Sequence, residues 1–218
     1  VPDSGADHLP WNVVADANGG FVTTWHVCED DCRGERLTAT ATGQTSGYVI
    51  IADFTDDFPS TSCYFAPNSS YTTFARNDDG SLGPIQLPFS FDLYGTVYTQ
   101  VWINNNGNLT FTGPSSVYSP SGFPFNTAMV AAFWADVDTR SSGSGRVKYK
   151  INPTNLTVTW AGVGYYEEHS DKLNTFQIII SNGSDPLIGI GNNVAFNYGD
   201  MQWTTGSASG GSGGFGGT

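Results

Sequence analysis

The sequence predicts an all-β fold in which antiparallel sheets pack in a β-sandwich-like arrangement. Between residues 88 and 111, aromatic and β-branched side chains alternate with polar ones, which is the period of half-buried strands. Gly95 and the asparagine-rich segment 104–108 interrupt this alternation, as tight turns do. No sustained amphipathic helical pattern occurs anywhere in the 218 residues.

Residues 1–57 form the first predicted unit, a short immunoglobulin-like β segment. Alternating residues at 21–26, 37–43 and 48–54 predict three strands. The Thr-rich stretch 19–56 resembles the last strands of immunoglobulin-like repeats in bacterial surface proteins. A complete sandwich of that type has about seven strands. We therefore expect this segment either to be completed by a partner or to pack on the domain that follows it.

An acidic linker around Pro59 leads into the second predicted unit, residues 58–218. Alternating hydrophobic residues predict strands at 145–151, 156–163 and 175–180, and we interpret 128–132 as a strand rather than a helical turn. Large aromatic residues at such positions are usually buried. We therefore expect four tryptophans to lie in the core: Trp102, Trp134, Trp160 and Trp203.

Two motifs in the second unit resemble the nidogen-like extracellular domain of basement-membrane, mucin-type and large bacterial surface proteins. They are the run 88–111 and the motif Ala131-Ala-Phe-Trp-Ala-Asp-Val-Asp-Thr-Arg140. The resemblance implies a non-enzymatic protein of the extracellular space or cell surface. It also implies that the Gly/Ser-rich tail, residues 204–218, lies inside the domain and that further strands follow it. The composition of the tail alone predicts a flexible linker.

The charge balance excludes two classes of partner. The formal net charge is −12, and only 13% of residues are charged, against about 25% in an ordinary globular protein. Nucleic acid and anionic membranes would repel such a chain, whereas cations are compatible with it. The sequence contains no run of about 18 apolar residues, so it predicts no segment that inserts into a membrane. The chain begins at Val1 with no visible signal peptide, which fits a processed chain or a piece of a longer polypeptide.

The chain contains three cysteines, an odd number. Cys28 and Cys32 lie close enough in sequence to close a small disulfide loop, which suits a secreted protein. They could instead be two metal ligands, although no second Cys/His pair with zinc spacing follows. Cys63 is then left to be buried or to pair outside the chain.

Aspartates supply the candidate metal ligands. Asp136 and Asp138 share one face of a predicted strand, because side chains two apart point the same way. They could form a catalytic acid/base pair, contribute to a calcium site, or be neutralised by Arg140 on the same face. Asp78 and Asp79, like the asparagines at 104–108, could add oxygen ligands or could simply form turns. Calcium is the one cofactor that the sequence suggests.

Two further residue classes bear on function. Sequons at four positions predict N-glycosylation, and we expect each to lie on an exposed turn. The histidines occupy no nucleophile motif, and we interpret His169, beside Glu167 and Glu168, as part of a solvated loop tip. The four sequons begin at Asn68, Asn108, Asn155 and Asn182.

The sequence therefore predicts a structural or adhesive protein. One version is a filament subunit that assembles by strand exchange between neighbouring copies. This version would account for a strand-poor first unit and for missing strands after the tail. The alternative is a calcium-assisted module of a larger surface protein that binds glycans or matrix proteins. A glycosidase centred on Asp136 and Asp138 is disfavoured, because same-face strand neighbours lie only about 6.6–6.8 Å apart.

Overall fold

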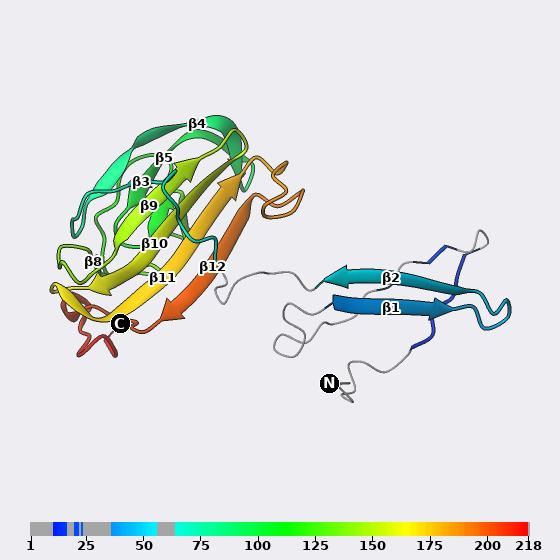
Figure 1. Cartoon of the computed structure of the whole chain (residues 1–218). Coiled ribbons are helices and arrows are strands. Elements are labelled where there is room, and N and C mark those ends of the chain that lie inside the picture. The colour runs from blue at the N-terminus through cyan, green and yellow to red at the C-terminus, as the bar shows by residue number, and fades with distance from the viewer. Residues whose placement is uncertain (1–10, 17–19, 22, 24–35, 56–63, 218) are drawn as a thin grey trace. The chain divides into compact units, whose positions relative to one another are not determined.

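The computed structural model describes residues 11–16, 20, 21, 23, 36–55 and 64–217. The chain divides into two compact units, residues 1–61 and 62–218, which we describe separately. In the first unit, β1 (Arg36–Thr42) pairs antiparallel with β2 (Val49–Thr55) (Figure 1). These are two of the three strands expected there. The third, at 21–26, lies mainly outside the described residues.

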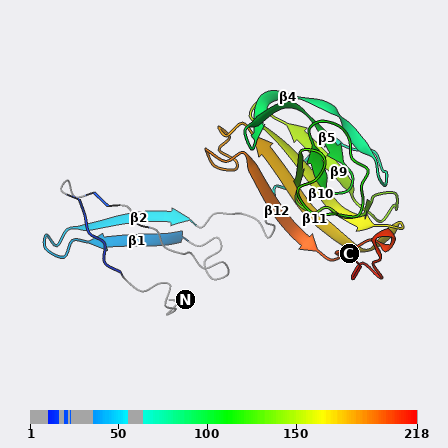
Figure 2. The ribbon, with the colours of Figure 1, turned by 180° about the vertical axis from the view of Figure 1, so that it is seen from behind.

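The second unit is a sandwich of two antiparallel sheets, which confirms the all-β prediction. Figures 1 and 2 show β4 and β5 stacked over the layer that contains β9 to β12. The larger sheet has the order β12-β11-β10-β9-β3, and β8 also pairs with β10. Its strands are β3 (Thr72–Thr73), β8 (Val137–Asp138), β9 (Arg146–Ile151), β10 (Asn155–Tyr165), β11 (His169–Ser181) and β12 (Val194–Met201). The smaller sheet consists of β4 (Ser81–Leu93), β5 (Thr96–Asn104), β6 (Asn108–Thr110) and β7 (Met129–Ala131).

Aromatic side chains fill the core between the two sheets. Trp160 stacks on Phe176 with a centroid separation of 4.9 Å, and Phe133 meets Trp203 edge-on at 5.2 Å. Such pairs contribute beyond the burial of their area. Trp134 is also buried, so three of the four tryptophans expected in the core lie there, and Trp102 is half-buried.

The first described residues of the second unit, Tyr64 and Phe65, cover part of the outer face of the larger sheet. Since Phe176 and Ile178 face the core, Gln177 between them points to the opposite face, yet it is fully buried. The Gln177 amide donates to the carbonyl of Phe65 at 2.9 Å and accepts from the Phe65 N–H at 3.3 Å. It also donates to the Thr159 hydroxyl at 2.6 Å. A buried amide is thereby satisfied by backbone that crosses the sheet.

The Gly/Ser-rich tail folds onto the second unit and is not a flexible linker. Trp203, just before it, is buried and donates its indole N–H to the carbonyl of Val163 at 3.0 Å. The backbone N–H groups of Thr204 and Thr205 both donate to the carbonyl of Gly214, at 2.7 and 3.0 Å. A short 3₁₀ turn, η2 (Ser207–Ser209), lies within the resulting loop. The tail is therefore part of the domain, as the family resemblance implies.

Among the described residues, no helix has the length and apolar character that crossing a bilayer requires.

Candidate functional site

The candidate site lies where a turn before β4 meets strand β8. Asp78 and Asp79 belong to the turn, and Asp136 and Asp138 lie on either side of Val137. Asn77 joins the two segments, because its N–H donates to the Thr139 hydroxyl at 2.9 Å and its carbonyl accepts the Thr139 N–H at 3.0 Å. Two pieces of chain that are distant in sequence thereby hold their carboxylates side by side.

Arg76 strengthens this junction, although sequence reasoning did not identify it. Its guanidinium donates to five backbone carbonyls after β8, and the shortest of these hydrogen bonds reach Thr139 and Ser141, at 2.6 Å each, and Ser144, at 2.9 Å. A rigid fork of donors suits several acceptors at once. Only its position in the three-dimensional fold reveals this role, since nothing in its sequence neighbours marks it.

Asp78, Asp79 and Asp136 form a compact group, which we call the acidic cluster. One carboxylate oxygen from each lies within 4.8 Å of the others. Asp138 is not a member of this group, although the sequence placed all four aspartates together as candidate ligands. It pairs with Arg140, whose Nε and Nη2 donate to it at 3.0 and 2.6 Å. The neutralisation by Arg140 considered from the sequence therefore occurs at Asp138.

The electrostatics separate Asp138 from the acidic cluster. Burial opposes ionisation of Asp138, but hydrogen bonds from Arg140 and from the Glu168 N–H outweigh it and lower its pKa. For Asp136, burial and then the neighbouring carboxylates raise the pKa to about 7. Burial and the carboxylates of Asp138 and Asp79 likewise raise the pKa of Asp78 to about 6. Arg140 also contacts Asp78, at 3.1 Å, so a single guanidinium is shared between two aspartates.

Two carboxylate oxygens in the cluster have no hydrogen-bond partner among the described residues. They are Oδ2 of Asp136, a residue only 2% exposed, and Oδ1 of Asp78. Buried polar atoms are nearly always hydrogen-bonded, because an unpaired one loses its hydration without replacement. The cluster therefore presents oxygen acceptors that lack a positive or donor group.

The asparagine-rich turn at 104–108 holds the cluster in place through hydrogen bonds. Asn106 donates to Asp79 at 2.8 Å, and its side-chain oxygen accepts the Val137 N–H at 3.1 Å. Asn105 donates its side-chain amide to the Val137 carbonyl and its backbone N–H to the Gly80 carbonyl. These asparagines are buried, so they do more than form the turn expected from the sequence. They fix the separation between the two acidic segments.

The Gly/Ser-rich tail closes the other side of Asp136. A Cβ atom placed on Gly206 would lie 2.6 Å from the Cβ of Asp136 and 2.8 Å from its Oδ2. Beside Asp136, Trp134 and Ser209 line a cavity of about 20 Å³. A water molecule fits such a space, but a sugar ring does not. The geometry therefore gives no support to a glycosidase centred on Asp136 and Asp138.

The four sequons divide into two pairs. Asn68 and Asn182 are exposed, and each accepts hydrogen bonds from the serine two positions later. Asn108 and Asn155 are buried: Asn108 accepts from Asn104 at 2.7 Å, and Asn155 donates to Asp185 at 2.6 Å. The expectation that all four lie on exposed turns is therefore wrong for Asn108 and Asn155, where polar networks in the sandwich take up the amides.

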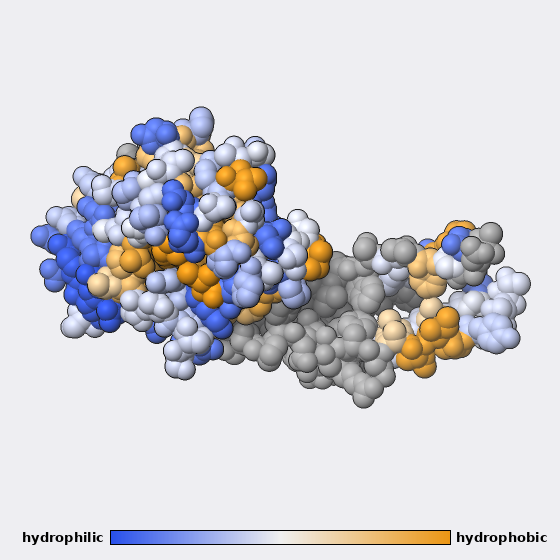
Figure 3. All heavy atoms as spheres, turned by 90° about the horizontal axis from the view of Figure 1, so that it is seen from above, coloured by the Kyte–Doolittle hydropathy of each residue, from blue (hydrophilic) through white to orange (hydrophobic). Residues whose placement is uncertain are grey.

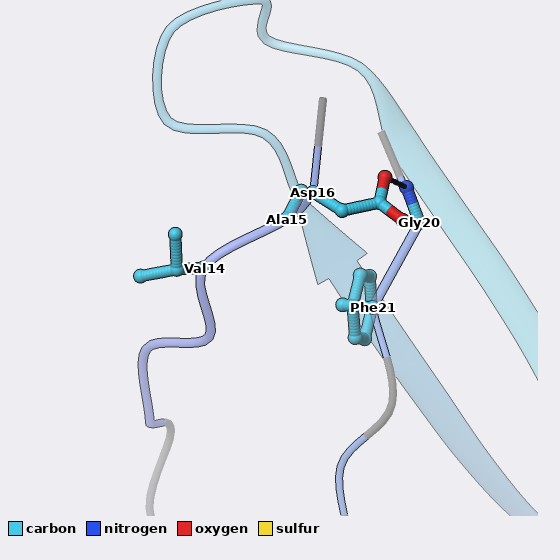
Figure 4. A pocket seen from close by; sticks show the side chains of 5 residues that line it. All are labelled: Val14, Ala15, Asp16, Gly20 and Phe21. Atoms are coloured by element: carbon cyan, nitrogen blue, oxygen red, sulfur yellow. Dashed lines mark hydrogen bonds between the residues drawn. The ribbon is translucent and has the colours of Figure 1, made fainter. Parts of the chain in front are cut away.

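Three further features are His169, a hollow in the first unit and the cysteines. His169 begins β11 and is exposed, with its ring stacked on Tyr165 at 4.7 Å. A hollow of about 500 Å³ in the first unit is lined by Val14, Phe21 and Asp16, whose carboxylate accepts the Gly20 N–H at 2.8 Å (Figure 4). Among the residues that the structure describes, no other ionisable side chain lines this hollow. Cys28 and Cys32 lie outside the described residues, as does Cys63.

Comparison with known proteins identifies the second unit. The NIDO related family matches residues 57–217. Alpha-tectorin of Homo sapiens is 33% identical over 167 residues, which cover 64% of this chain and 8% of that protein. The Mus musculus alpha-tectorin is 31% identical with the same coverage. Nidogen of Drosophila melanogaster is 30% identical over 175 residues, covering 61% of this chain and 12% of that protein.

The chain thus spans only about a tenth of the length of these relatives. No solved structure is significantly similar to it. The family match begins at residue 57, so the immunoglobulin-like interpretation of residues 1–57 stays a prediction. For the sandwich that carries the acidic cluster the match is nearly complete, and on this ground the chain belongs to the NIDO related family.

Proposed function

We propose that this chain is a non-enzymatic structural or adhesive protein of the extracellular space or cell surface. Its family and its similarity to alpha-tectorin and nidogen support this proposal. The chemistry of the site agrees with it, since Asp138 is held by Arg140 and the cavity at Asp136 is too small for a sugar ring. Its partners are then further copies of the chain, other domains of a larger surface protein, or glycans.

Within this role, we propose that copies associate by strand addition at β12. The observation that carries the proposal is the position of β12, which ends the larger sheet with no described strand on its outer side. Phe196 and Tyr198 are 44% and 39% exposed along this strand. An open edge with apolar side chains is a template for another strand. Natural sheets usually protect such an edge with charges, bulges or proline. On β12, Asp200 and a register irregularity lie beyond Tyr198, at the C-terminal end of the strand.

The hairpin β1–β2 is the strand donor that we propose for a neighbouring copy. An isolated two-stranded sheet is at best marginally stable in water. Val49, Ile50 and Ile51 in β2 are each more than half exposed, and apolar side chains are visible on this unit in Figure 3. Pairing with β12 of another copy would bury these side chains and satisfy the backbone of both edges.

Light scattering over a concentration series and negative-stain electron microscopy test this association. Phe196→Lys places a charge on the open edge and should abolish assembly while leaving the sandwich folded. Ile190→Lys is the matched control, because it makes the same change at an exposed residue in the loop before β12. A strict monomer at all concentrations would contradict strand addition but not the extracellular structural role.

A calcium-assisted module that binds glycans or matrix proteins is a second candidate. The acidic cluster favours the cation part of this function. Among the described residues, the one positively charged side chain in ionic contact with its three carboxylates is Arg140, which contacts Asp78. Binding to a glycan panel, measured with calcium and with chelator, tests it. Glycan binding that needs calcium supports this candidate, and glycan binding that chelator leaves unchanged contradicts it.

A further inference from the structure

We propose that Asp78, Asp79 and Asp136 bind one Ca²⁺ ion. This ion would link the turn before β4 to the start of strand β8, next to the Gly/Ser-rich tail. The first observation is the spacing of the ligand atoms. One oxygen from each carboxylate lies within 4.8 Å of the other two. Calcium binds oxygen at about 2.3–2.6 Å, so two ligands of one ion are at most about 5 Å apart. The three carboxylates therefore already stand at ligand separation.

The second observation is independent of the spacing, and it concerns unpaired oxygens. Asp136 is 98% buried, since it is 2% exposed, and its Oδ2 accepts no hydrogen bond from any described residue. Oδ1 of Asp78 is also buried and accepts no hydrogen bond from any described residue. In a folded protein, a buried carboxylate is normally compensated by a hydrogen-bond donor, a counter-charge or a metal ion.

The charge around the cluster shows that the described protein groups do not supply this compensation. Arg140 is the one cation in ionic contact with these aspartates among the described residues, and Asp138 takes two of its hydrogen-bond donors. Its remaining contact reaches Asp78. Asp79 receives a neutral amide donor from Asn106, and no described residue gives Asp136 a charge or a donor at Oδ2. A divalent cation at the centre would balance the excess negative charge.

The ligand chemistry selects calcium. Carboxylate oxygens suit hard cations, whereas zinc sites generally include histidine or cysteine, and the described group contains neither. Magnesium demands near-ideal octahedral geometry and is usually held by one or two carboxylates. Three carboxylates, with waters completing a flexible shell, match calcium better. This site differs from an EF-hand, because its ligands come from two separate segments.

An ion at this position would stabilise the tail as well as the turn. Gly206 lies against Asp136, and Ser207 donates its N–H to the Tyr166 carbonyl at 3.1 Å. Tyr166 in turn donates its N–H to the Asp136 carbonyl at 3.1 Å. Fixing Asp136 therefore fixes the backbone on which the tail rests. Calcium should protect amides in residues 76–80 and 204–211 from hydrogen exchange.

Calorimetric titration of the full chain with CaCl₂, after removal of metal with chelator, tests the site. We expect one saturable site per chain and a melting temperature that rises with calcium and less with magnesium. Asp136→Asn and Asp79→Asn should each weaken calcium affinity at least tenfold. Asp200→Asn is the control for the loss of one negative charge, since Asp200 is exposed on β12. It should bind calcium as the wild type does.

Terbium luminescence gives a second readout for variants of altered stability. Trp134, two residues before Asp136, is close enough in sequence to sensitise Tb³⁺ bound there. Calcium should displace terbium from the wild type, and Asp79→Asn, which leaves Asp136 in place, should lose the signal while keeping its circular dichroism. Absence of binding, or binding that both cluster variants leave unchanged, would overturn the proposal. A chain that stays monomeric can still bind calcium. The calcium test is therefore independent of the test of strand addition.

Discussion

Gly206 lies directly against the carboxylate of Asp136, so a Cβ atom there would come within 2.8 Å of Oδ2. This contact joins the Gly/Ser-rich tail to the acidic cluster. The backbone conformation of Gly206 is an ordinary extended one, with φ −73° and ψ 162°. Glycine is therefore required here by lack of space rather than by backbone geometry. The tail and the cluster should respond together to substitution.

Gly206→Ala should lower the free energy of unfolding by about 1–3 kcal/mol, because a methyl group must displace either the tail or Asp136. Denaturant unfolding measures this change, and hydrogen exchange should show faster exchange in residues 204–211. Gly113→Ala is the matched control, since no atom of the described residues lies within 4 Å of a Cβ at that position. Equal stability of the two variants would contradict the contact.

Arg140→Met should destabilise the protein by about 1–3 kcal/mol, since it removes the charged donors from the buried carboxylate of Asp138. The two backbone N–H donors, from Arg140 and Glu168, remain and limit the loss. The same change removes a competing cation from Asp78, so calcium affinity at the acidic cluster should rise. Thermal unfolding and calcium titration measure these two effects.

Arg140→Lys separates charge from geometry. Lysine keeps the positive charge but lacks the planar fork that donates from both Nε and Nη2. Its stability should fall between those of the wild type and Arg140→Met. Should Arg140→Met match the wild type in stability, the pairing with Asp138 would be unimportant for folding.

The local pattern of the chain was sufficient to predict most strands. The segments 145–151, 156–163 and 175–180 follow period 2 and lie within β9, β10 and β11, apart from one residue at an end. The sequence also selected Asp78, Asp79 and Asp136 by their oxygen chemistry. It could not show that Asp138 pairs with Arg140 and lies outside the acidic cluster, because this depends on which segment packs beside β8.

Long-range contacts explain what the sequence did not predict. Asn108 and Asn155 look like surface sequons, but neighbouring polar side chains in the fold bury and satisfy them. Arg76 and Gly206 carry no local signal, since both act on residues far away in the chain. The composition of the tail predicted disorder because composition omits the sheet ends against which it packs.

The sequons give a prediction of glycan occupancy at each position when the chain is secreted from a eukaryotic cell. Glycan should be found at Asn68 and Asn182 in the folded protein and be absent from Asn108 and Asn155, because a buried amide has no room for a sugar. Mass spectrometry of glycopeptides measures occupancy at each position. Glycan at Asn108 in monomeric, folded material would contradict the buried network around it.

Asp185 should make stability depend on pH in the acidic range. Burial opposes its ionisation, but hydrogen bonds from Thr154, Asn155 and the Leu187 N–H outweigh this and hold its pKa below the ordinary value. The unfolded chain then binds more protons than the native one in this range. The contribution of Asp185 is therefore present above about pH 4, the ordinary aspartate pKa, and is lost as pH falls below it.

Asp185→Asn isolates this contribution, because comparison with the wild type cancels the carboxylates that the two proteins share. The variant should be less stable by about 1–3 kcal/mol between about pH 5 and pH 7, since a charged acceptor of three hydrogen bonds is lost. The difference should shrink as pH falls below about 4. Urea unfolding at each pH provides the measurement, and Asp200→Asn controls for the change in net charge. A difference that stays constant down to the lowest pH would show that the hydrogen-bonded carboxylate of Asp185 is not the group responsible.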